Sequence, residues 1–193
     1  MTRRLVPLLA LFALFVSVPA VAHAPGMLHA DQTTVLENPK ASRILVGTFR
    51  TGSELFVARL TFETGFATPF EIFTPHREEL RNFRPAYAVV CQGLPIPPME
   101  VQTRLPRPLP EGAGAFVDFN ELVPRPVLWE FVMRRVYWTT DPTAVPLPAG
   151  DCDVWIWSPS KQRGPMALGV GVEEKFGMQA VSDLFENWSD YAY

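Results

Sequence analysis

Short apolar segments alternate with proline- and glycine-rich connections along most of this 193-residue chain. The segment Leu55–Phe62 has an apolar residue at every second position from Phe56 onward. Arg59 and Thr61 lie between them, so the two kinds of side chain would point to opposite faces of an extended strand. The same reasoning predicts eight strands: Ile44–Phe49, Leu55–Phe62, Phe70–Phe73, Ala86–Cys91, Ala115–Phe119, Val136–Thr140, Cys152–Trp157 and Met166–Val172.

These strands predict a mainly β fold. Short strands separated by turn residues are typical of an antiparallel β-sandwich or a jelly-roll-like domain, whereas bundles and parallel α/β sheets need more helices than this pattern offers. The strand Cys152–Trp157 is apolar on both faces, so it is expected to be central or covered by a loop. Two proline-rich regions, Leu94–Pro110 and Asn120–Pro126, are predicted to be loops or edges where a binding function could lie.

The two ends of the chain differ from this pattern. Arg3 and Arg4 precede an apolar run, and Ala20-Val21-Ala22 supplies the small residues of a signal-peptidase site, so residues 1–22 are expected to be a signal peptide. A β-sandwich domain is expected over residues 23–177. A short amphipathic helix that docks on it is expected over residues 178–193, where the residues with helical spacing are Val181, Leu184, Phe185 and Trp188.

Charge and hydropathy indicate where the protein is located and which classes of partner it can bind. The chain carries 17 basic and 20 acidic residues, and removal of the signal takes away two of the basic ones. This negative balance argues against nucleic acid as a partner. No apolar run after residue 22 approaches the roughly 18 residues of a spanning helix, so we expect no membrane span and a periplasmic or secreted protein. An unknown protein or saccharide ligand is the expected partner.

Cys91 and Cys152 are the two cysteines of the chain. Thiols oxidise in exported proteins, so a disulfide between them is predicted. In the loop-entropy model, a closure of this length would stabilise the fold by roughly 4 kcal/mol. A thiolate metal site is the alternative, although an isolated pair lacks the CxxC spacing typical of one.

Cleavage after Ala22 would place His23 at the amino terminus. Cleavage after Ala24 is disfavoured, because Pro25 would directly follow the cleaved bond. A terminal histidine offers an amine and an imidazole nitrogen, and copper(II) prefers tetragonal nitrogen ligands. His23 together with His29 or His76 would resemble the histidine brace of exported copper carriers and lytic polysaccharide monooxygenases. The simpler interpretation is an accidental terminal histidine and two surface histidines.

Sequence motifs for hydrolysis are absent: there is no Gly-x-Ser-x-Gly elbow, phosphate loop or HExxH. Hydrolysis by a nucleophilic triad is therefore not expected, and copper-dependent oxidation is kept as an alternative activity. Four tryptophans could instead stack on sugar rings as a carbohydrate-binding module, but core packing is the stronger expectation for tryptophans in strands. These residues are Trp129, Trp138, Trp155 and Trp157, with Tyr137 beside them.

Several short motifs follow one another along the chain: Glu37–Arg43, Asn82–Val90 with Gly93–Pro95, Gly112–Ala115, Tyr137–Trp138, Val145–Gly150, and Gly164–Gly171 with Glu173–Gly177. Their order resembles a widespread family of exported, uncharacterised β-sandwich proteins, and the last motif is similar to the small non-catalytic sandwich domains appended to secreted peptidases. Met166 replaces the family's usual tyrosine, and both cysteines lie where the family has other residues. The resemblance implies a non-catalytic exported binding or accessory protein, with a copper-binding protein or a carbohydrate-binding module as alternatives.

Overall fold

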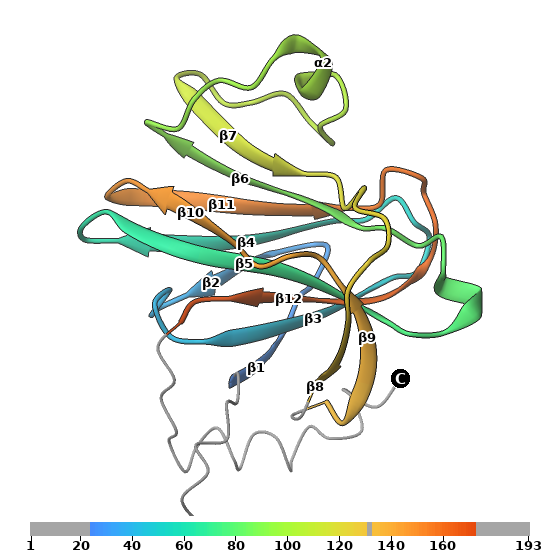
Figure 1. Ribbon diagram of the computed structural model, residues 1–193. Coiled ribbons are helices and arrows are strands. Elements are labelled where there is room, and N and C mark those ends of the chain that lie inside the picture. Colours follow the sequence, from blue (N-terminus) through green and yellow to red (C-terminus); the bar gives the residue numbers. More distant parts are fainter. Residues whose placement is uncertain (1–23, 131–132, 173–193) are drawn as a thin grey trace, which may run out of the picture.

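Two β-sheets packed face to face account for most of residues 24–130 and 133–172, which are the residues that the computed structural model describes (Figure 1). In spatial order, the seven-stranded sheet contains β1 (Ala24–Met27), β3 (Arg43–Phe49), β12 (Gly164–Val170), β5 (Phe66–Pro75), β9 (Arg135–Thr139) and β8 (Val127–Glu130), and β10 (Thr143–Leu147) also pairs with β5. The five-stranded sheet contains β2 (Thr33–Leu36), β4 (Leu55–Phe62), β11 (Gly150–Trp157), β6 (Ala86–Gln92) and β7 (Ala113–Asp118). The mainly β, sandwich-like fold predicted from the sequence is thereby confirmed.

Each of the eight predicted strands overlaps a strand of the structure, but the expectation of purely antiparallel sheets is wrong. β1 pairs in parallel with β3, and β2 pairs in parallel with β4. Parallel neighbours need a crossover connection of a dozen or more residues. The segment 28–42 provides it for β1 and β3, because it crosses to the opposite sheet, forms β2 there and returns.

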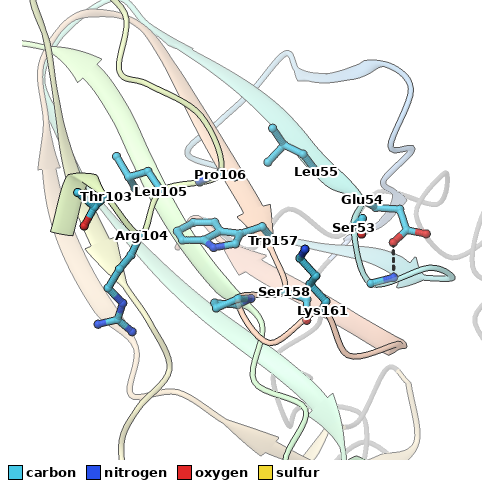
Figure 2. Close-up of a pocket in the computed structure, with 12 residues that line it drawn as sticks. Ser53, Glu54, Leu55, Thr103, Arg104, Leu105, Pro106, Trp157, Ser158 and Lys161 are labelled. Carbon is cyan, nitrogen blue, oxygen red and sulfur yellow. Dashed lines mark hydrogen bonds between the residues drawn. The ribbon is translucent and has the colours of Figure 1, made fainter. Parts of the chain in front are cut away.

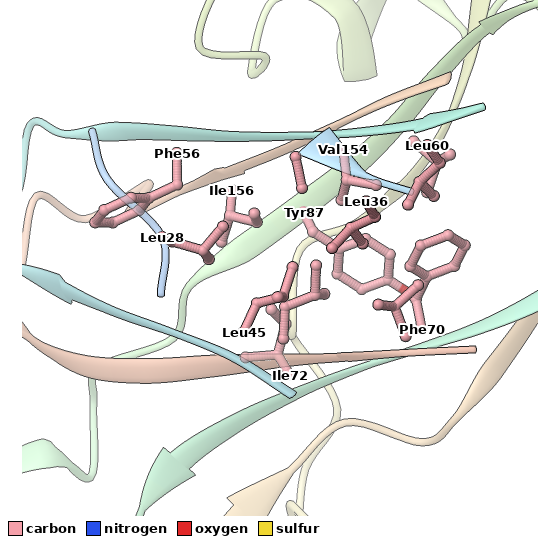
Figure 3. Close-up of a cluster of buried hydrophobic side chains, with 14 of the residues drawn as sticks. Leu28, Leu36, Leu45, Phe56, Leu60, Phe70, Ile72, Tyr87, Val154 and Ile156 are labelled. Atoms are coloured by element: carbon pink, nitrogen blue, oxygen red, sulfur yellow. The ribbon is translucent and has the colours of Figure 1, made fainter. Parts of the chain in front are cut away.

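The main core lies between the two sheets (Figure 3). Along β4, buried and more exposed residues alternate as predicted, and Phe56 and Leu60 point into the core. Side chains from the inner face of the other sheet meet them there, among them Leu45, Phe70 and Ile72. Burial of these apolar surfaces is the main force that holds the sheets together.

The proline-rich segment Leu94–Pro110 covers the outer face of the five-stranded sheet. It contains one helical turn, α2 (Met99–Gln102), and otherwise forms a loop, as predicted. Arg107 places its guanidinium carbon 4.2 Å from the Trp155 ring centre, and Leu105 packs against the same apolar cluster. β11 lies between β4 and β6 beneath this loop, which confirms the expectation of a central, covered strand.

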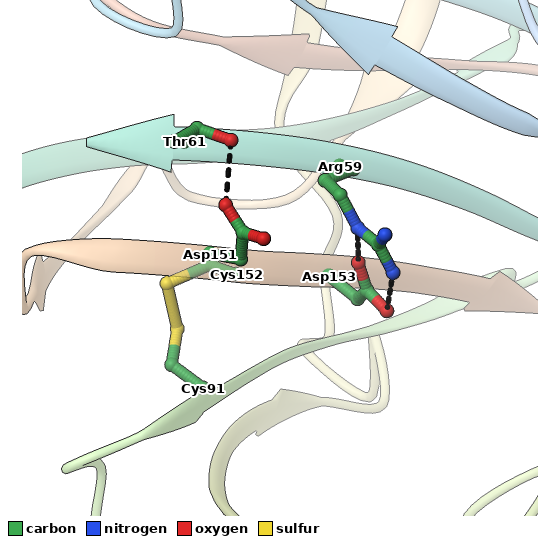
Figure 4. Close-up of a disulfide and its surroundings, with 6 residues drawn as sticks. All are labelled: Arg59, Thr61, Cys91, Asp151, Cys152 and Asp153. Carbon is green, nitrogen blue, oxygen red and sulfur yellow. Dashed lines mark hydrogen bonds and ion pairs between the residues drawn. A yellow bond between two sulfur atoms is a disulfide. The ribbon is translucent and has the colours of Figure 1, made fainter.

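Cys91 and Cys152 form a disulfide between β6 and β11 (Figure 4). The two residues lie directly opposite each other in the strand register, with their Cα atoms 4.6 Å apart and both side chains buried. On the exposed side of β11, Asp153 pairs with both Nε and Nη2 of Arg59, at 2.8 and 3.1 Å. The predicted disulfide is present, and it joins strands that the ladder already aligns.

Candidate functional site

The described residues include two of the three predicted copper ligands, His29 and His76. His23 and the expected helix over residues 178–193 lie outside the described residues. His29 follows β1 and His76 follows β5, and these two strands are separated by β3 and β12. Three strand spacings amount to roughly 14 Å, and the two histidines line different pockets.

Within 24–130 and 133–172, no group of three or more His, Cys, Asp or Glu side chains is placed to hold a metal ion. A brace would need only one of the two described histidines beside His23. The copper site therefore stays a prediction of the sequence.

A large hollow of about 550 Å³ lies between the β3–β4 turn, the proline-rich loop and the turn after β11 (Figure 2). Two of its charged groups, Glu54 and Arg104, already have structural roles. Glu54 accepts hydrogen bonds from the backbone N–H groups of Arg50, Thr51 and Gly52 at 2.7–2.8 Å. Burial raises the pKa of Glu54, but hydrogen bonds from Thr51 and the other turn amides outweigh it and lower the pKa to about 2.

On the other side of this hollow, Arg104 pairs with Glu121, and its guanidinium carbon lies 3.6 Å from the Phe119 ring centre. The walls are therefore held by contacts internal to the protein. These contacts explain the shape of the hollow without a ligand.

A second pocket, here called the arginine pocket, has a different chemistry. Its volume is about 440 Å³, which is within the range of small-molecule sites. It lies where the end of β5, the 3₁₀ turn η1 (Glu78–Leu80), the loop before β8 and strand β9 meet. The lining residues are His76, Glu78, Arg81, Arg84, Val123, Pro124, Arg125, Val127 and Trp138.

Arg125 is the most unusual residue of this pocket, because it is only 8% exposed and pairs with no carboxylate of the described chain. Its Nη1 donates to the Thr74 hydroxyl at 3.0 Å and to the Phe83 carbonyl at 3.1 Å, and its Nη2 donates to the Arg81 carbonyl at 2.6 Å. Buried charges in proteins are normally paired. Burial, and next the nearby charge of Arg84, lower the pKa of Arg125 to about 10.

Arg84 is held just as firmly. Its Nη1 donates to the carbonyls of Asn120 and Leu122, at 2.8 and 3.0 Å, so it ties the loop before β8 to the start of β6. Asn120 in turn donates from Nδ2 to the carbonyl of Pro85 at 3.3 Å. Both arginines are thus fixed by neutral acceptors, and neither pairs with an opposite charge in the part of the chain that the structure describes.

Trp138 forms the aromatic wall of the pocket. It is half-buried, the Arg125 guanidinium carbon lies 4.3 Å from its ring centre, and the His76 ring lies 4.5 Å away. The one acidic lining residue, Glu78, pairs with Arg81 at 3.2 Å. Arg84 and Arg125 consequently leave two positive charges beside a flat apolar surface.

The fold places the four tryptophans of the predicted sugar-binding surface in different environments. Trp155 and Trp157 are buried under the proline-rich loop, which confirms the expectation of core packing for these two. Trp129 is 59% exposed and Trp138 lines the arginine pocket, so these two tryptophans remain available to a ligand. The sequence marked the loop Asn120–Pro126 as a place for binding, but nothing in it distinguished Arg84 and Arg125 from other arginines.

No model of a known protein family matches the chain, and a comparison with curated proteins finds no match. The family resemblance therefore stays a prediction. In the described part of the chain, no helix has both the length and the apolar character needed to cross a membrane.

Proposed function

We propose that this chain is an exported, non-catalytic β-sandwich protein that binds the anionic group of a ligand in the arginine pocket. The observation that carries this proposal is Arg125, a buried guanidinium with no carboxylate partner in the described chain. A carboxylate, phosphate or sulfate oxygen beside Arg125 and Arg84 would supply the missing charge and weaken their mutual repulsion. Charge-assisted hydrogen bonds of this kind are roughly twice as strong as neutral ones.

A binding role suits the residues of the pocket better than catalysis does. Its lining contains no serine, threonine or cysteine that could act as a nucleophile beside His76. Trp138, Val123 and Val127 instead offer an apolar surface next to the charged end. The leader-like residues 1–22 and the resemblance to exported sandwich proteins support the location.

The proposal is tested by titrating the protein with benzoate, inorganic phosphate and a galacturonate oligomer, and with benzamide and a galactose oligomer as neutral counterparts. Anions should bind and their neutral counterparts should not. The affinity should decrease as salt is added, because dissolved ions screen the attraction between the incoming anion and the arginines. Benzamide is the sharpest control, because it has nearly the same shape as benzoate without the charge.

Two variants with the same change in net charge locate the site. Glu78 lines the pocket and Glu79 does not. E78Q should therefore raise anion affinity roughly threefold at low salt, whereas E79Q should leave it nearly unchanged. Equal binding of charged and neutral probes, no binding of any anion, or identical effects of E78Q and E79Q would each contradict the proposal.

A further inference from the structure

The outermost strand beside the arginine pocket has an unusual surface. β8 is the last strand of the seven-stranded sheet, and Val127, Leu128 and Trp129 are 56%, 45% and 59% exposed. Natural edge strands are usually protected by charged side chains, prolines, bulges or a covering loop, because an exposed edge recruits further strands. Three consecutive exposed apolar residues therefore form this edge, and no other described strand pairs with it.

The register shows which backbone groups of β8 have no partner strand within residues 24–130 and 133–172. Pro126 accepts a hydrogen bond from the N–H of Thr139, and Val127 is opposite Trp138. Because hydrogen-bonded and non-bonded pairs alternate in an antiparallel ladder, Val127 and Trp129 direct their N–H and C=O groups away from β9. In agreement, Val136, which is opposite Trp129, uses its carbonyl on the other side of β9, where it accepts from His76.

The same two residues carry apolar side chains on the pocket side. Directly opposed residues of a ladder share a face, so Val127 and Trp129 lie on the face of Trp138 and Val136. Val127 lines the arginine pocket, and Val136 is 39% exposed. Backbone groups that point away from β9 and the apolar side chains of Val127 and Trp129 thus lie on one edge of the sheet. The positively charged arginine pocket lies beside it.

We infer that β8 is the docking edge for an extended, acidic segment of a partner protein, which adds to the sheet as a strand and places an Asp or Glu side chain in the arginine pocket. The inference rests on the proposed anion-binding function of that pocket. The free groups of Val127 and Trp129 repeat every two residues, about 7 Å along the strand, which matches the backbone of another strand. A saccharide lacks this repeat of donors and acceptors.

A second copy of the chain fits this edge poorly. Pairing of two β8 strands would bring two positive pockets together without bringing an acid to either. The one acidic residue of β8, Glu130, is 5% exposed and accepts a hydrogen bond from the backbone N–H of Met133, so it is already engaged. The charge of the pocket therefore favours a different, acidic partner.

The test is a selection of random peptides displayed on phage against the disulfide-bonded protein, followed by synthesis of the enriched peptides. We expect sequences with alternating apolar residues and an Asp or Glu at a fixed position, and replacement of that acid by its amide should weaken binding roughly tenfold. A library that yields no enriched peptide, or peptides without an acidic preference, would overturn the inference.

Two substitutions of Val127 then separate the contribution of its backbone N–H to peptide binding from that of its side chain. V127P removes the outward N–H and keeps the bonds to β9, because the Val127 N–H does not take part in them. V127T keeps this N–H and nearly the same shape. The peptide should bind V127P roughly tenfold more weakly, and V127T less than about threefold more weakly.

Two further readouts keep the outcomes distinct. Amide exchange at Val127 and Trp129 should slow when the peptide is added to the unaltered chain, which provides an answer even if V127P does not fold. Unchanged exchange at both residues, or equal peptide binding by V127P and V127T, would overturn the inference. If benzoate binding responds to E78Q but no peptide binds at the β8 edge, the proposed anion-binding function is retained and the docking strand is excluded. Tight binding of the galacturonate oligomer, insensitive to V127P, would assign the pocket to an acidic saccharide instead.

Discussion

The guanidinium carbon of Arg125 lies 4.3 Å from the ring centre of Trp138, and this contact joins the loop before β8 to strand β9. Arginine suits this position because its planar group stacks on an aromatic face and still donates hydrogen bonds in its own plane. Here the donors reach Thr74, Phe83 and Arg81. The same side chain therefore closes the loop and supplies the charge of the pocket.

Replacement of Arg125 by lysine should destabilise the protein although the charge is kept. Lysine has no planar fork, so it cannot serve the three acceptors and stack on Trp138 at once. We expect the free energy of unfolding to decrease by about 1–3 kcal/mol, measured by urea denaturation. R81K is the control, since the side chain of Arg81 is 69% exposed and should contribute less than about 0.5 kcal/mol. Equal effects of the two substitutions would contradict the role of Arg125.

The register of β8 predicts unequal losses of stability for proline at two adjacent positions. Leu128 is paired with Tyr137 and, by the alternation of the ladder, donates its N–H to β9, whereas the N–H of Val127 points away. L128P should therefore lower the free energy of unfolding by about 2–3 kcal/mol, and V127P by less than about 1 kcal/mol. Thermal and urea unfolding followed by circular dichroism would check this. A larger loss for V127P than for L128P would mean that the two positions have the reverse orientation.

The strands that sequence could predict are those in which burial alternates or is continuous. β8 lacks this pattern, because it is exposed at three of four positions. Burial does alternate along β10, but Pro146 within it argued against a strand. β1 and β2 have only four residues each and lie at sheet edges, so too few of their side chains face the core to set a pattern. The two parallel pairings depend on where residues 28–42 cross between sheets, which local propensity does not encode.

The candidate site was harder to predict from the sequence than the fold. Arg84 and Arg125 are far apart along the chain, and their burial follows only from the loop that brings them together beside Trp138. The prediction of a disulfide succeeded because two cysteines leave one pairing. The copper hypothesis depends on His23, outside the described residues, so it stays a prediction.

The Cys91–Cys152 disulfide should contribute more to stability than the ion pair beside it. The bond closes 61 residues of chain, for which the loop-entropy model gives roughly 4 kcal/mol. The double variant C91A/C152A should lose about this much in urea denaturation, whereas D153N, which breaks the partly exposed pair with Arg59, should lose less than about 1 kcal/mol. In the untreated protein, thiol titration should detect no free cysteine until a reductant and denaturant are added. Two reactive thiols before that treatment would contradict the disulfide.

Copper binding through an amino-terminal His23 is tested by titrating the processed, metal-free protein with copper(II) and recording its electron spin resonance. A brace should give a nitrogen-rich tetragonal signal that is lost when one extra residue precedes His23. H29A and H76A should identify the second imidazole, because the two histidines line different pockets. Affinity should decrease as acid protonates the terminal amine, whose reference pKa is about 8. Absence of stoichiometric binding, or indifference to the extra residue, would exclude the brace.

Glu71 on β5 should make the stability of the protein depend on pH. Burial, and next the charge of Asp141, raise its pKa to about 7, although a hydrogen bond with Thr139 opposes them. The folded state therefore binds a proton that the unfolded state releases above its ordinary pKa of 4.5. The stabilising effect of this proton is fully present below pH 4.5 and is lost as the pH rises toward 7.

Substitution of Glu71 by glutamine, which resembles the protonated acid, should remove this dependence. We expect E71Q to be more stable than the unaltered chain by about 1–2 kcal/mol at pH 8, after allowance for partial solvent screening, and nearly equal at pH 4. D141N should produce a smaller gain at pH 8, because the charge of Asp141 is a lesser cause of the shift than burial. Urea denaturation at both pH values measures each effect. A gain for E71Q that is the same at pH 4 and pH 8 would show that packing, and not ionisation of Glu71, is responsible.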